Sequence, residues 1–61
     1  MTTKMIITAL AASSLVALKN VEERLDHYRR ANDASETFAH RGTQLQLLAR
    51  LEWLSELAQS L

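Results

Sequence analysis

The chain contains no cysteine and no proline, and it has one glycine and three aromatic residues. The lack of cysteine excludes disulfide bonds and zinc sites built on thiolates. The lack of proline, together with the single Gly42, leaves almost nothing that would interrupt a helix. We therefore expect an all-α chain whose stability does not come from covalent cross-links.

Charge of one sign is also lacking, because seven basic residues balance seven acidic ones. This balance argues against a general affinity for nucleic acid or for an anionic membrane. Serines near the chain ends lie far in sequence from His27 and His40, and no glycine-rich loop is present to hold a phosphate. We predict a protein that is not an enzyme and that has no catalytic residues, no cofactor and no metal site.

The length of 61 residues predicts one domain, 1–61, with a small core. A domain of this size buries only about 60% of the surface that its unfolded chain exposes, and small domains usually need an additional source of stability. Since disulfides are excluded, association with another chain is the expected source.

Apolar residues recur at alternating steps of four and three, which is the period of a helix packed along another helix. One such pattern covers residues 7–28 and a second covers 47–61, with turn-forming residues between them at 32–35. We predict an antiparallel two-helix hairpin with helices at about 3–31 and 34–60. Two hairpins, or one hairpin and partner helices, would then form a four-helix bundle.

The predicted hairpin core combines this pattern with an aromatic pair, Tyr28 and Phe38, that is expected to meet beside the bend. Gly42 is expected opposite Leu25, where a missing side chain permits close approach. We expect the second helix to continue through Gly42, and a restart at Thr43 is the alternative. The core set is Ile7, Ala11, Leu18, Val21, Leu25, Tyr28, Phe38, Leu47, Leu51, Leu54 and Ala58.

More apolar side chains are present than one hairpin can bury, and they lie towards the two chain ends. Residues 5–18 carry no charge, and residues 45–61 are rich in leucine. We therefore predict an interface with a partner protein or a second copy at the open end of the hairpin. Its residues are Ile6, Leu10, Leu15, Val16, Leu45, Leu48, Trp53 and Leu57.

Charged residues concentrate around the bend instead. The basic residues there, Arg24, Arg29, Arg30 and Arg41, are a candidate nucleic-acid patch, although acidic residues surround them. The alternative is a solvated surface with helical ion pairs such as Asp26–Arg30. His27 and His40 are expected to be solvent-exposed.

The N-terminal segment also has the lysine and the apolar stretch of a signal peptide, but it lacks a clear cleavage site. The charge-free stretch 5–18 is shorter than the roughly 20 residues of a membrane-spanning helix. We therefore expect a buried helix face, no membrane partner and a cytoplasmic location.

In length, hairpin layout and lack of cysteine, with Phe38 followed by a helix rich in leucine and alanine, the chain resembles the small co-chaperones of type III secretion systems. In length and bend position it also resembles the dimeric RNA-binding hairpins that control plasmid copy number, and phage anti-activators have a similar size. These resemblances concern layout and share no motif. We expect a helical protein-interaction module acting as an adaptor, co-chaperone or inhibitor. The alternatives are a dimeric RNA- or DNA-binding regulator and a type III secretion co-chaperone-like assembly factor.

Overall fold

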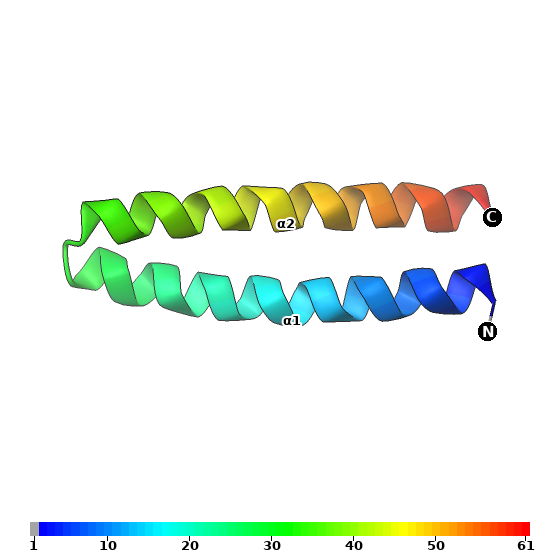
Figure 1. Ribbon diagram of the computed structural model, residues 1–61, viewed down its shortest axis with the longest axis horizontal. Helices are drawn as coiled ribbons and strands as arrows, with labels where there is room; N and C mark the ends of the chain where they lie inside the picture. The colour runs from blue at the N-terminus through cyan, green and yellow to red at the C-terminus, as the bar shows by residue number, and fades with distance from the viewer. Residues whose placement is uncertain (1) are drawn as a thin grey trace.

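The computed structural model describes residues 2–61 as two helices joined by a short turn. Helix α1 spans Thr3–Arg30 and helix α2 spans Ala34–Ser60. The helices lie side by side, with the turn at one end and both chain termini at the other (Figure 1). The predicted all-α fold and the helical hairpin are confirmed.

The molecule is a rod with extents of 44 × 15 × 11 Å. Its radius of gyration is 14.1 Å, whereas a compact domain of this length would have a value of about 10.5 Å. The hairpin is therefore one layer of helices with two broad faces, and every residue outside the seam between the helices lies on a face or an edge.

Side-chain caps define where both helices begin. The Met5 amide donates to the Thr2 hydroxyl at 3.2 Å, and the Glu36 amide donates to the Asp33 carboxylate at 3.1 Å. Each cap satisfies a backbone N–H that has no partner within the helix. The negative charge of Asp33 is also favourable at the positive end of the α2 dipole.

The turn between the helices is a Schellman motif built on Asn32. Asn32 has a φ of 55°, in the left-handed region that asparagine tolerates better than most residues. The Asp33 amide donates to the Tyr28 carbonyl at 3.0 Å, and the Asn32 amide donates to the Arg29 carbonyl at 3.2 Å. These bonds end α1 and position Asp33 to start α2 at once.

The core is a single seam along the contact between the helices. In α1 it follows the predicted steps of four and three, with Ala11, Val21 and Tyr28 half-buried. In α2, Leu51 and Ala58 are half-buried in the same way. The buried positions are Ile7, Ser14, Leu18, Leu25, Leu47 and Leu54.

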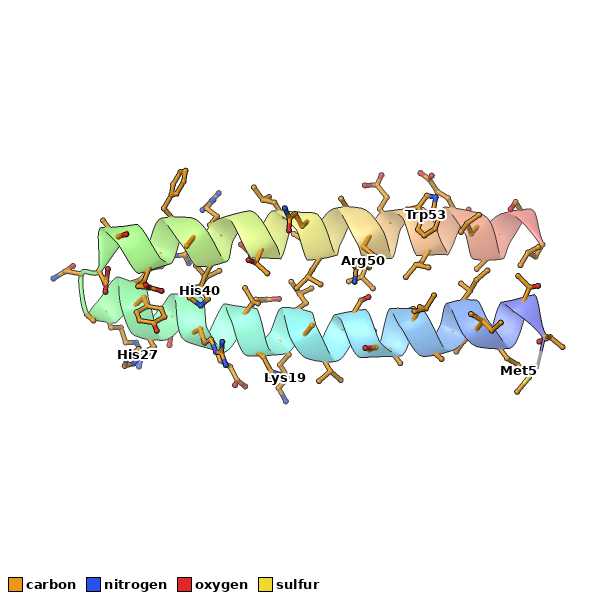
Figure 2. The ribbon with its side chains drawn as sticks, in the orientation of Figure 1. Met5, Lys19, His27, His40, Arg50 and Trp53 are labelled. Atoms are coloured by element: carbon orange, nitrogen blue, oxygen red, sulfur yellow. The ribbon has the colours of Figure 1, made fainter. Side chains whose placement is uncertain are left out.

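Phe38 is not part of this core, and its predicted contact with Tyr28 is wrong. The Phe38 side chain is 83% exposed. Tyr28 instead packs against His40, with ring centroids 5.1 Å apart, and Figure 2 shows His40 on the side of α2 that faces α1. The α2 seam near the bend passes through Thr37, His40 and Gln44, all half-buried. Since each helical residue turns by about 100°, Phe38 points away from this line.

Gly42 likewise does not provide a close approach between the helices. Helix α2 runs through Gly42 without a break, as expected. However, a Cβ added to Gly42 would have no described atom within 4 Å to contact. Gly42 is two residues beyond His40, which places it on the outside of α2 rather than opposite Leu25.

Candidate interaction surface

Most of the large apolar side chains remain exposed on the hairpin. Phe38 is the most exposed of them, and the others lie mainly in the half of the rod that carries the chain ends. Surfaces of this kind on a small protein mark sites of association. The exposed set is Met5, Ile6, Leu10, Leu15, Val16, Phe38, Leu45, Leu48, Trp53 and Leu61.

One broad face of the rod carries Ile6 and Leu10 from α1 and Trp53 and Leu57 from α2. Counted from the buried seam, all four lie on the same flank of their helices, and equivalent flanks of two oppositely directed helices form one face. Figure 2 shows Trp53 on α2 in the half of the rod that also holds Met5. We call these four residues the tryptophan face.

The opposite broad face carries Leu15 from α1 and Phe38, Leu45 and Leu48 from α2. These residues lie on the other flank of each helix. Phe38 was not predicted from the sequence to be a surface residue. Its spacing of seven residues from Leu45 and ten from Leu48 is the signal that places the three on one flank of a helix. We call these four residues the phenylalanine face.

The predicted interface residues therefore divide between two faces. Ile6, Leu10, Trp53 and Leu57 form the tryptophan face, with Leu57 half-buried. Leu15, Leu45 and Leu48 belong to the phenylalanine face. Val16 lies on the outer edge of α1, away from α2.

Figure 1 shows that α2 begins beside the end of α1 and ends beside its start, so Arg30 is nearly level with Ala34 and Thr3 with Ser60. Since both helices rise about 1.5 Å per residue in opposite directions, Leu10 is nearly level with Trp53. Ile6 is nearly level with Leu57, about one turn nearer the chain ends. The tryptophan face is thus one continuous apolar patch.

Charged residues interrupt the phenylalanine face. By the same relation, Leu45 is nearly level with Lys19 and Leu48 with Leu15, and Glu52 follows Leu48 by one turn on the same flank. A surface depression beside this flank of α1 is lined by Leu15, Lys19 and Glu22, among others. The two faces therefore present different chemistry, the first apolar and the second a mixture of apolar and charged groups.

The arginines of the candidate nucleic-acid patch do not share one surface. Arg24 lies on the flank of the tryptophan face, and Arg30 pairs with Asp26 at 3.1 Å on the outside of α1. Arg29 and Arg41 are brought together, because both line a shallow depression at the bend that also contains Phe38. Two arginines beside an exposed aromatic ring are what remains of the predicted patch.

The histidines occupy different environments. His27 is exposed, as expected, but the His40 side chain is only 19% exposed. The His40 ring lies against Tyr28, and its Nδ1 atom is 2.8 Å from the Glu36 carbonyl oxygen. The prediction of an exposed His40 was wrong because His40 occupies a seam position of α2. Within residues 2–61, no three histidine, aspartate or glutamate side chains are grouped closely enough to hold a metal ion.

Helix α1 is long and apolar enough to cross a membrane by length and composition. Its most apolar window of 18 residues has a mean hydropathy of 1.4, and 22% of that window is buried. Membrane spans, signal sequences and the core helices of soluble proteins all share these properties.

Comparisons with protein-family models, with curated proteins and with solved structures find no match to this chain.

Proposed function

We propose that this protein is a non-enzymatic helical interaction module. It docks its exposed apolar faces onto helices of another protein or of a second copy and acts as an adaptor, co-chaperone or inhibitor, of which a type III secretion co-chaperone-like assembly factor is one form. The observation that supports this proposal is the exposure of large apolar side chains on both broad faces of the rod.

The free energy at stake is large for a hairpin of this size. Burying a leucine-sized or larger side chain is worth about 1.5–3 kcal/mol. Side chains such as Leu10, Leu45 and Trp53 are about half exposed, so covering them all would recover several kcal/mol. This amount is comparable with the whole stability of a small domain, roughly 0.05–0.15 kcal/mol per residue. Docking onto other helices is therefore strongly favoured over exposure to water.

The proposed complex is a four-helix bundle in which the antiparallel hairpin supplies two helices. Helical bundles bury apolar flanks in this way, and their charged residues stay on the outer surface. The proposed location is cytoplasmic, where helices of other soluble proteins are available as partners.

Partner capture followed by direct titration tests the proposal. The chain should capture a protein from its cells of origin, and the purified pair should bind in isothermal titration calorimetry. Leu48→Asp should weaken that binding by at least about 30-fold, the effect of losing a hot-spot residue.

Ser55→Asp is the matched control, because it adds the same charge to the same flank of α2 at an exposed polar position. It should bind the partner as the unmodified chain does, and circular dichroism should show that both variants remain helical. Equal affinities of the two variants would count against docking through this flank.

A second candidate is a small RNA- or DNA-binding regulator, and Phe38 is the observation that favours it. Exposed aromatic rings stack on nucleobases, and neighbouring arginines contact phosphates. Phe38, Arg29 and Arg41 line one depression at the bend. Two nearby acidic residues have partners of their own, since Asp26 pairs with Arg30 and Asp33 accepts the Glu36 amide.

Fluorescence titration with a single-stranded oligonucleotide tests this candidate. Affinity should fall steeply as the salt concentration rises. Phe38→Ala should remove stacking worth about 1–3 kcal/mol, and Arg29→Ala combined with Arg41→Ala should reduce the salt dependence. The Arg30→Ala control should have little effect, because Arg30 lies outside the depression. No binding at low salt would eliminate this candidate.

A further inference from the structure

We propose that the tryptophan face, formed by Ile6, Leu10, Trp53 and Leu57, is where a second copy of this chain docks, with both open ends at the same end of a four-helix bundle. This inference rests on the proposed function and specifies the partner of one of its two faces.

The area of a broad face fits the requirement of a stable dimer. Specific interfaces bury about 800 Å² on each partner. A face of 44 by 15 Å covers roughly 660 Å² before side-chain relief is added, whereas an edge of 44 by 11 Å covers roughly 480 Å². A dimer therefore needs a broad face, and the outer edges of the helices are too narrow.

The arrangement of apolar groups selects the tryptophan face for self-pairing. When the two-fold axis runs along the rod, α1 of one copy lies over α2 of the other at the same level. Leu10 then lies over Trp53 of the second copy, and Ile6 lies over its Leu57 about one turn nearer the chain ends.

Self-pairing through the phenylalanine face would be far less favourable. The same symmetry would place Lys19 over Leu45 and Glu52 over Ala12 of the second copy. Each contact removes a charge from water without giving it an opposite charge, which is costly. The mixed chemistry of this face fits a different partner, so the face remains free in the proposed dimer.

The direction of the second copy follows from the charges. If the bends lay at opposite ends, Leu10 would lie near the level of Arg24 of the second copy, so apolar side chains would cover cations. With the bends at the same end, Arg50 is the only charged residue among 2–61 in the open half of the tryptophan face. It then lies between the levels of the second copy's Ser13 and Ala17, beside which its guanidinium reaches water.

Sedimentation equilibrium of a matched pair of variants tests the dimer. Leu10 is 50% exposed on the tryptophan face, and Leu48 is 45% exposed on the other face. Leu10→Asp should weaken self-association at least about 30-fold, while Leu48→Asp should change it less than about threefold. A chain that stays monomeric at about 1 mM, or an effect of Leu48→Asp equal to that of Leu10→Asp, would overturn the proposal.

Disulfide trapping keeps the test decisive if Leu10→Asp fails to fold. The chain has no cysteine, so Leu10→Cys and Trp53→Cys chains can be prepared separately and mixed under oxidation. The mixed disulfide should form in preference to either disulfide-linked homodimer, and a Leu15→Cys and Leu48→Cys mixture should not cross-link above background. Equal cross-linking of both mixtures would contradict the assignment.

The outcome also separates this inference from the proposed function. If the chain is monomeric and Leu48→Asp abolishes partner binding, the proposed function is retained and the proposed dimer is rejected. If the chain is monomeric and captures no partner, both proposals are rejected.

Discussion

The half of the rod that carries the chain ends and the half that carries the bend are built from the same two helices but from different side chains. Near the chain ends, the described seam is apolar except for Ser14, and most of the exposed large apolar side chains lie on the flanks. Near the bend, Leu25 and Tyr28 face a polar α2 seam that includes His40.

The bend half satisfies its polar groups within the hairpin. Asp33 caps α2, and the turn amides donate to carbonyls of the last turn of α1. Asp26 pairs with Arg30, and His40 lies 3.6 Å from the Glu36 carboxylate. Exposed ion pairs add little stability, but they are compatible with water.

The half near the chain ends differs because large apolar side chains lie exposed among its polar ones. The comparison shows that one hairpin contains a half suited to water and a half suited to contact with other helices. The bend half closes the turn, and docking is the role that we propose for the half near the chain ends.

The largest expected effect tests whether the two halves share one continuous core. Leu25 near the bend and Leu54 near the chain ends are both 2% exposed. Leu25→Ala and Leu54→Ala should each lower the free energy of unfolding by about 2–5 kcal/mol, because each leaves a cavity. Urea denaturation followed by circular dichroism measures both. A loss below about 1 kcal/mol for Leu25→Ala alone would mean that the polar seam near the bend can close over the gap.

A smaller effect is expected at the turn. Asp33→Ala removes the acceptor of the Glu36 amide and should lower the free energy of unfolding by about 1 kcal/mol. Asp33→Asn keeps a side-chain oxygen and should retain most of the stability. Thermal denaturation at one protein concentration compares the two variants. Equal melting temperatures for Asp33→Ala and the unmodified chain would show that the cap does not stabilise the bend half.

The smallest effect is a gain. Gly42→Ala should raise the free energy of unfolding by about 0.8–1.0 kcal/mol, since alanine is the better helix former and the added Cβ contacts no described atom within 4 Å. Thermal denaturation should show a higher melting temperature, with the oligomeric state unchanged. A destabilised variant would mean that Gly42 permits close contact with another molecule.

Periodicity predicted α1 well because its seam residues are mostly apolar. The steps of four and three from Ile7 to Tyr28 coincide with the buried and half-buried positions. In α2, the same method worked for Leu47 and Leu54 but not near the bend. There the seam positions are polar, and the apolar Phe38 stands one residue beside Thr37.

The surface was predicted in composition but not in layout. An excess of apolar residues near the chain ends is visible in the sequence, and so are the four arginines near the bend. A count of residues does not tell which flank each one occupies. The angular positions of Leu10 and Leu48 follow only when the line of contact between the helices is known.

The sequence by itself determined the helices, their ends and the place of the turn. Those features depend on local bonds, such as the caps at Thr2 and Asp33 and the left-handed backbone at Asn32. Only the tertiary structure decided that His40 rather than Phe38 enters the seam, and that the exposed apolar residues divide between two faces. The physical reason is that packing one helix on another selects a single line of contact, and every other side chain is then placed by its angle from that line.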